Sequence, residues 1–247
     1  MRWLGLILIL WAELTPKFIM AQQKTSEEST FSNEFSGGFL LHPRGLGVNF
    51  RNSKKFNETT WRTFEVDLMN MKHPKEFKIR STSFQNTPGS YTFGKLNYLY
   101  FIHTGFGVRK ELASKLYKNT ISTTLQLSGG PVFSLLKPVY LEIYYPYDNS
   151  SGYLMSERYD PAVHTRQEDI FGASKFSKGL GEMSARVGLY TRVAANFDWS
   201  DFNDQLQAVE LGVMTDIFPQ RLPVMAFTQN KFLYTSVYIC VNFGSRW

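Results

Sequence analysis

Apolar and polar side chains alternate at every second position along most of this chain. The clearest run is 183–197, where Met183, Val187 and Val193 occupy one parity and Arg186 and Arg192 occupy the other. Successive side chains of a β-strand point to opposite faces, so the run predicts a strand with one apolar and one polar face. A helix would place both arginines among the apolar side chains, and we therefore favour the strand.

Seven further runs show the same period. They are 34–42, 46–54, 61–71, 98–110, 121–133, 205–218 and 233–243. The connections 55–59, 112–118 and 198–204 are short, whereas 72–97, 137–182 and 219–231 are long. Short turns on one rim and long loops on the other are typical of outer-membrane barrels, with the long loops outside. The tight connection at 42–45 is an exception. We predict an all-β fold with negligible helix: an eight-stranded antiparallel up-and-down transmembrane β-barrel over 33–247, with long outer loops 72–97 and 137–182.

The N-terminal residues predict export. Arg2 provides a positive charge, and the apolar run 3–12 is followed by Glu13 and Pro16. Such a run is typical of a signal peptide and is shorter than the roughly 20 residues of a spanning helix. We expect residues 1–21 to be a signal peptide cleaved after Ala21, and residues 22–32 to form a polar tail. The alternative is a buried N-terminal helix.

Alternation alone does not decide which face points outward. A soluble lipocalin-like carrier would turn its polar face to water, whereas an outer-membrane barrel turns it inward. The polar parity is rich in glycine, as at Gly105, Gly188 and Gly212, which suits a crowded interior. It also has four charges of each sign, and buried ions must pair. We expect a filled interior of ion pairs and no channel; its members are Arg51, Arg109, Arg186 and Arg192 with Glu65, Asp67, Glu210 and Asp216. His103, on the same parity, is expected to be a hydrogen-bonded core histidine.

The C-terminal strand carries a resemblance. The alternating run 233–243, the ending Asn242-Phe243-Gly244-Ser245-Arg246-Trp247 and the Ala21-Gln22 junction resemble those of small outer-membrane barrels of the Bacteroidota. The resemblance implies a bacterial outer-membrane location and assembly through a C-terminal aromatic signal. Trp247 lies four residues past Phe243, so this sequence departs from the simplest form of that signal.

Composition narrows the chemistry. Aromatic residues are 16% of the chain, which suits a membrane interface. The net charge of +6 is spread along the chain, which disfavours nucleic-acid binding, and four histidines with the single Cys240 leave few candidates for metal or thiol sites. No phosphate-binding glycine loop, nucleophile elbow or zinc-protease motif occurs. We predict no catalytic residues, metal or cofactor. A rim-site enzyme built on His73, His164 and Asp169 stays open as an alternative.

Two outer segments are candidates for binding. The basic segment with His73, Lys75, Glu76 and Lys78 is expected to bind lipopolysaccharide phosphates or an acidic partner, with solvated rim charge as the alternative. Alternation continues past the fifth strand with Tyr140, Tyr144 and Tyr145, which predicts either an extension of that strand above the membrane or a partner-docking surface, and a connection of this length is usually functional. We therefore expect a non-enzymatic outer-membrane protein that binds or scaffolds a protein partner through its outer loops, as an accessory subunit of an assembly or secretion complex. The alternatives are a lipid- or peptide-modifying rim enzyme and a lipocalin-like carrier.

Overall fold

The computed structural model describes residues 31–81, 89–114, 120–148, 151–200 and 204–247. The expected signal peptide at 1–21 and all but the last two residues of the expected tail lie outside the described residues. Within these ranges one short helix occurs, the 3₁₀ turn η1 (Leu180–Glu182), and no helix is long and apolar enough to cross a bilayer.

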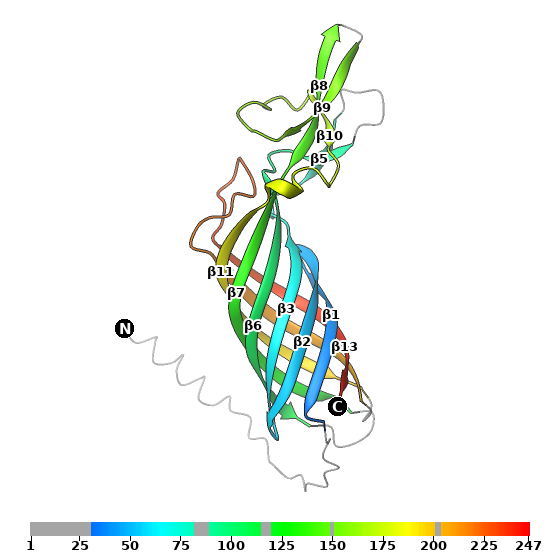
Figure 1. The fold of residues 1–247 in the computed structure, drawn as a ribbon, viewed down its shortest axis with the longest axis vertical. Helices are drawn as coiled ribbons and strands as arrows, with labels where there is room; N and C mark the ends of the chain where they lie inside the picture. Colours follow the sequence, from blue (N-terminus) through cyan, green and yellow to red (C-terminus); the bar gives the residue numbers. More distant parts are fainter. Residues whose placement is uncertain (1–30, 82–88, 115–119, 149–150, 201–203) are drawn as a thin grey trace, which may run out of the picture.

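Eight antiparallel strands form a closed barrel (Figure 1). They are β1 (Asn33–His42), β2 (Gly45–Asn57), β3 (Thr60–Met71), β6 (Asn97–Ala113), β7 (Ser122–Pro138), β11 (Ser184–Asp198), β12 (Gln205–Ile217) and β13 (Leu233–Arg246). Each strand pairs with the barrel strand before and after it in the sequence, and β1 pairs with β13 to close the ring. The predicted eight-stranded up-and-down barrel is confirmed.

The alternation of the sequence separates the two faces of the barrel wall. In β13 the outward parity, with Val237 and Ile239, is exposed, whereas Tyr238 and Cys240 are buried in the interior. The same division holds in β11, where Leu189 is 67% exposed and Arg192 is fully buried. The apolar parity therefore faces outward and the polar parity faces inward, which is the reverse of a lipocalin-like carrier.

The interior has two parts. Ion pairs and polar side chains fill the middle and the end at which β1 begins and β13 ends, which we call the terminal end. At the opposite end the inward parity becomes apolar, with Met69 and Phe101 fully or nearly fully buried. Leu222 and Val224, from the connection between β12 and β13, are also buried in this apolar cluster. The expectation of a wholly polar filling is therefore wrong at this end, because a returning loop supplies apolar side chains that need apolar partners.

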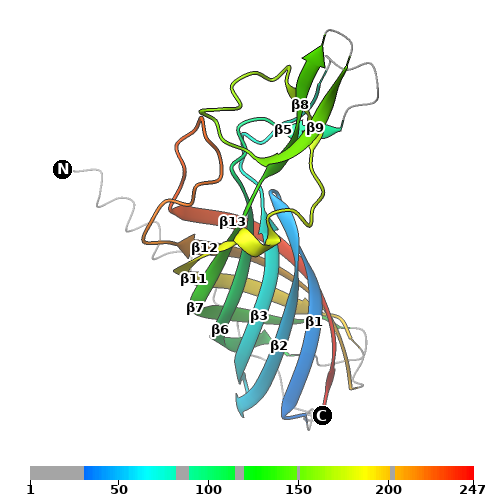
Figure 2. The same cartoon turned by 45° about the horizontal axis from the view of Figure 1, so that its top comes forward.

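A folded head stands on the barrel end opposite the terminal end (Figure 1). It contains the sheet β10-β8-β9, made of β8 (Tyr140–Asp148), β9 (Ser151–Arg158) and β10 (Ile170–Ala173). A two-stranded sheet, β4 (Lys78–Arg80) with β5 (Ser90–Thr92), lies beside it, as the turned view in Figure 2 shows. The segments that the sequence predicted to be outer loops, 72–97 and 137–182, are thus partly strands.

The head has its own apolar core. Leu141 and Ile143 of β8 are buried against Ile170 of β10, together with Tyr91 of β5 and Tyr159. Leu141 and Ile143 are two positions apart in β8, so they lie on the same face of the head sheet, and this face is buried. The head is therefore a folded structure and not a set of loose loops.

Candidate functional site

The centre of the barrel is a network of two arginines and three carboxylates. Arg51 donates two hydrogen bonds to Glu210, one of them of 2.7 Å from Nη2, and its Nε lies 3.5 Å from Glu65 Oε2. Arg192 donates to Asp67, and its Nη1 lies 3.2 Å from Glu65 Oε2. All five side chains are almost completely buried, so the two guanidiniums offset most of the negative charge of the three carboxylates inside the barrel.

Neutral side chains complete the coordination of these carboxylates. Glu65 accepts hydrogen bonds from Gln126 (2.9 Å), Ser128 (2.7 Å) and Tyr190 (2.9 Å), and Glu210 accepts one from Tyr238. The two tyrosines need space: a side chain at Gly105 would collide with the Tyr190 hydroxyl, and the Cβ of one at Gly212 would lie 2.7 Å from the Tyr238 hydroxyl. Inward glycines are therefore required because long polar side chains from nearby strands lie over them: Tyr238 is paired with Gly212 on the adjacent strand, and Tyr190 is two strands from Gly105.

A second ionic layer, most of which the sequence pattern does not predict, lies near the terminal end. Arg109 Nη1 donates to Glu34 over 2.7 Å, and Arg246 donates to Glu34 over 3.0 Å and to Asp198 over 2.6 Å. Arg109 alone of these was expected in the core. Asp198 and Arg246 lie on the inward parity one and three residues past the predicted runs, whereas Glu34 is the first residue of the predicted run 34–42 and was not counted among the interior charges.

The structure corrects the expectation for Arg186. Its parity is inward, but it lies near the head end of β11 and its side chain is exposed. The expected balance of four positive and four negative charges is also wrong, because the interior of the described barrel contains six carboxylates and four arginines. His103 lies among the excess acids: its Nε2 is 2.7 Å from Asp216 and its Nδ1 is 3.8 Å from Asp67. A hydrogen-bonded core histidine was expected at this position.

The basic segment after β3 is divided between structural and exposed residues. His73 is buried and accepts a hydrogen bond from the Lys75 amide, and Glu76 pairs with the buried Lys95. Burial lowers the pKa of the Lys95 ammonium, although its hydrogen bond to Glu76 acts in the opposite direction. Lys75 and Lys78 are exposed. Of the four residues expected to bind a partner here, these two lysines remain available to a ligand.

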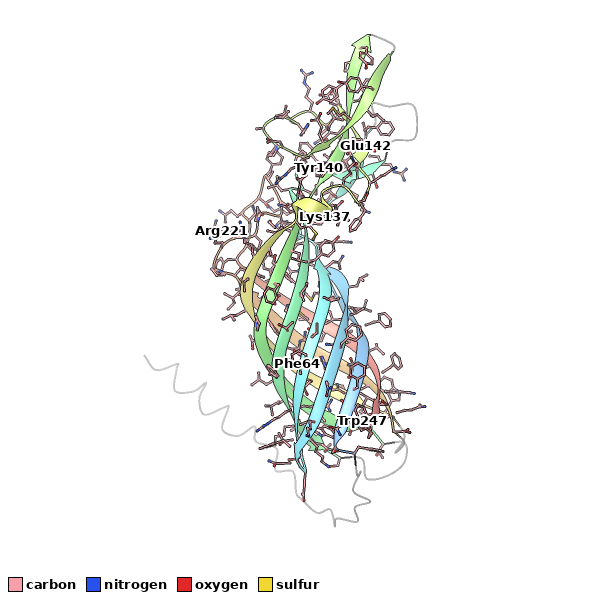
Figure 3. The ribbon with its side chains drawn as sticks, viewed as in Figure 1. Phe64, Lys137, Tyr140, Glu142, Arg221 and Trp247 are labelled. Carbon is pink, nitrogen blue, oxygen red and sulfur yellow. The ribbon has the colours of Figure 1, made fainter. Side chains whose placement is uncertain are left out.

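A neck of fixed contacts joins the head to the barrel. β7 ends at Pro138 and β8 begins at Tyr140, so the chain runs from the wall into the head almost without interruption. Lys137 marks this junction in Figure 3, with its ammonium 5.2 Å from the Tyr98 ring centroid and 4.7 Å from that of Phe176. The Lys95 ammonium lies 4.1 Å from the same Tyr98 ring. Cation–π contacts of this kind help to fix the head's attachment.

The free end of the β8–β9 hairpin carries a group of tyrosines. Tyr145 stacks on Tyr153 with ring centroids 5.5 Å apart, and Tyr147 lies 5.0 Å from the same Tyr153 ring. Tyr147 is 75% exposed and Tyr153 is 42% exposed. The Tyr145 hydroxyl donates to Glu157 over 2.8 Å, and this hydrogen bond raises the pKa of Tyr145. We call Tyr145, Tyr147 and Tyr153 the tyrosine tip.

The other two tyrosines expected to bind a partner support the head. Tyr140 donates to Glu182 and lies against Gly179, and Tyr144 lies over Gly152 on the neighbouring strand. Figure 3 places Tyr140 close to the neck. Among the expected aromatic residues, Tyr145 alone belongs to the exposed tip. Tyr147 and Tyr153 were not among the expected site residues; Tyr147 is two positions from Tyr145 on the same strand, and the pairing of the hairpin places Tyr153 opposite Tyr145.

The histidines offered for rim-site chemistry are held by local contacts. His164 accepts a hydrogen bond from the Asp160 amide (3.0 Å) and lies 3.2 Å from Glu157. The hydrogen bonds found for His73 and His164 within the described chain include no serine. In the same part of the chain no group of three metal-ligating side chains is found.

Comparisons with known proteins give structural matches alone. No family model matches the chain, and no curated protein matches it in sequence. Among solved structures, the chain resembles Neisserial surface protein A (NspA) with a TM-score of 0.41 and 7% identity, over 88% of this chain and 97% of that one. It also resembles Ail, the attachment invasion locus protein of Yersinia pestis, whose structure contains the heparin analogue sucrose octasulfate. That match has a TM-score of 0.38 and 8% identity, over 88% of this chain and 99% of Ail. Likeness at this level adds nothing to the inference of function.

Proposed function

We propose that this chain is an integral barrel of a bacterial outer membrane that presents its head outside the cell. The support is the outer wall, where large apolar side chains are exposed on every barrel strand. They include Phe39, Leu46, Phe64, Phe106, Leu127, Leu189, Val213 and Ile239. A lipid environment removes a continuous apolar surface of this kind from water, and a closed barrel satisfies every backbone group there. The terminal end then faces the periplasm, and export through a signal peptide at 1–21 is part of this proposal.

Within that membrane we propose a non-enzymatic binding role for the head. The observation that carries it is the tyrosine tip, an exposed aromatic surface at the far end of a head with its own core. Tyrosine provides large contact area at low conformational cost and is enriched at binding hot spots. The filled interior supports the same view, because a barrel without a passage leaves its outer end as the functional surface. Membership of a larger assembly or secretion complex, and a Bacteroidota lineage, are finer proposals that rest on the sequence patterns.

The exposed lysines at the head rim are proposed to bind membrane anions. Lys75 and Lys78 lie just beyond the head end of β3, at the level where the outer leaflet would present phosphates. This assigns lipopolysaccharide to the rim and a protein partner to the tip.

The test is a comparison of two double variants in purifications from mild detergent. In Tyr147→Ser/Tyr153→Ser the tip loses two rings and no buried side chain. Val163→Ser/Phe77→Ser removes two exposed apolar side chains from other parts of the head and serves as the matched control. A protein that co-purifies with the wild type and the control, and is at least tenfold depleted with the tip variant, supports the proposal.

Two results would count against it. If the tip variant retains every co-purifying protein, the tip is not the binding surface. If protease added to intact cells fails to cleave the head while cleaving it in lysed cells, the head does not face outward, and the membrane orientation is wrong.

A further inference from the structure

A groove of about 860 Å³ crosses the outer wall of the barrel over five neighbouring strands, β2, β3, β6, β7 and β11. Phe64, Phe106, Val108 and Leu127 form its apolar walls. Phe106 pairs with Gly129, and Gly129 pairs with Thr191, so a residue without a side chain interrupts an outward-facing row of the wall. The groove has the volume of a typical small-molecule site, for which roughly 300–1,000 Å³ is usual.

The groove climbs from the terminal end toward the middle of the barrel. Its lower end contains Lys54 and Arg62, which pair with each other across β2 and β3, and Arg62 lies close to the start of β3. Its upper end contains Thr191, at the middle of β11. Five strands span four spacings of about 4.8 Å, or roughly 19 Å along the groove. Because strands of such barrels are tilted by about 35–45°, a row of residues that crosses them also rises through the membrane, and a length of this order suits an acyl chain in one leaflet of a core about 30 Å thick.

The lower end is positively charged. Lys54 and Arg62 are exposed there, and the exposed Lys110 pairs with Thr60 on the neighbouring strand. The Arg62 guanidinium lies 3.8 Å from the Phe56 ring centroid, which holds it at the edge of the wall. Glu58 and Glu111 are the acids closest in sequence, so the edge keeps a positive balance. Arginine matches the geometry of phosphate oxygens with two parallel hydrogen bonds.

We propose that this groove is a binding site for an anionic phospholipid of the periplasmic leaflet. The phosphate lies on Arg62 and Lys54, and one acyl chain runs along the outer surface of the Phe64 and Phe106 rings, whose centroids are 5.2 Å apart, and ends near Thr191. Figure 3 shows Phe64 on the wall below the level of Lys137, on the side of the barrel away from the head. The site rests on the proposed membrane location, and it is separate from the tyrosine tip and from the lysines of the head rim.

The test uses the full chain in detergent, with phosphatidylglycerol added and binding counted by native mass spectrometry. The wild type is expected to bind one phosphatidylglycerol at least tenfold more tightly than phosphatidylcholine. Lys54→Gln/Arg62→Gln is expected to lose that preference, whereas Lys175→Gln/Lys178→Gln, with the same charge change at two exposed lysines of the head, is expected to keep it. Thr191→Phe should weaken binding about fivefold or more by filling the upper groove, and Val187→Phe on the same strand face should not.

Other results separate failure of the site from failure of the proposed function. If phosphatidylglycerol and phosphatidylcholine bind equally well, or if both charge variants lose binding equally, the proposed site is wrong. In either case, insertion of the wild-type barrel into vesicles would still support the membrane location. If inorganic phosphate at the same concentration displaces the lipid, the groove is an anion site and the acyl assignment is wrong. If the wild type does not insert into vesicles at all, the proposed membrane location fails and the groove proposal fails with it.

Discussion

Arg51 and Arg192 decide the character of the barrel at the scale of single residues. Both guanidiniums are buried in the middle of the barrel, and each faces carboxylates from strands on the other side of the interior. An arginine has five donors in a rigid fork, so it can serve two carboxylates at once. Removing one arginine therefore leaves more than one buried carboxylate without its cation.

We predict that Arg192→Met strongly destabilises the barrel. Asp67 and Glu65 would lose a shared cation, and breaking a buried pair in this way costs about 3–5 kcal/mol. Urea unfolding in lipid vesicles, followed by tryptophan fluorescence, measures the change. Arg186→Met is the matched control, because Arg186 is on the same strand and parity but exposed, and its effect should stay within about 0.5 kcal/mol. Equal effects of the two variants would contradict the network as drawn.

The sequence could identify part of this network. Parity alone correctly assigns Arg51, Glu65, Asp67, Arg192 and Glu210 to one interior, because a strand has only two faces. It fails for Arg186, because parity gives the face on which a side chain lies but does not show whether that part of the strand is inside the buried interior or near its open end. It misses Arg246, because this residue lies three positions past the predicted run 233–243, where the alternation fades. Which arginine meets which acid depends on the register of strands far apart in sequence.

At the scale of elements, the strands and the head have different sequence signals. The barrel strands repeat a simple alternation against lipid on one side, so their existence and order follow from the sequence. The head strands β4, β5 and β10 are three or four residues long, and too few positions alternate in them for a pattern to appear. The apolar cluster inside the head end of the barrel could not be predicted for a different reason. Leu222 and Val224 reach it from a loop, and no local sequence pattern specifies the path of that loop.

A charge placed on the outward face of β13 should oppose membrane insertion according to its depth. We predict that Ile239→Arg, at the middle of the strand, costs roughly 2–4 kcal/mol of folding free energy in vesicles, and that Thr235→Arg, near the head end, costs roughly 0–1 kcal/mol. Both positions are exposed on the same parity, so the comparison isolates depth. Equilibrium folding titrations into vesicles measure both values. Equal costs would mean that the strand does not lie across a bilayer.

Thiol labelling tests the same strand by a different route. Cys240 is buried in the interior, and we predict that it resists both a membrane-impermeant and a lipid-soluble maleimide in the folded protein. In a Cys240→Ser background, Ile239→Cys should react with the lipid-soluble reagent at least tenfold faster than Cys240 does in the wild type. Rapid labelling of Cys240 from the lipid phase, with none at position 239, would invert the two faces of the wall.

At the scale of the whole molecule, one barrel separates three surfaces with different chemistry. The head end carries an aromatic tip, the wall is apolar, and the lower wall holds the charged edge of the groove. The long axis of the molecule sets the tip far from the wall, as Figure 1 shows. A partner at the tip and a lipid at the wall can thus be bound at the same time without sharing a side chain.

The whole molecule should not conduct ions. Eight strands leave an interior just wide enough for side chains, and here the middle is filled by the arginine–carboxylate network and the head end by apolar residues such as Phe101 and Phe218, whose ring centroids are 5.4 Å apart. An ion would have to displace both layers in series. We predict no conductance above background in planar bilayers at 1 M salt for the wild type. Phe101→Ala/Phe218→Ala, which opens the apolar layer alone, should also stay closed, because the ionic layer still fills the middle. Reproducible channels in the wild type would refute the filled interior, and channels in the double variant alone would place the seal in the apolar layer.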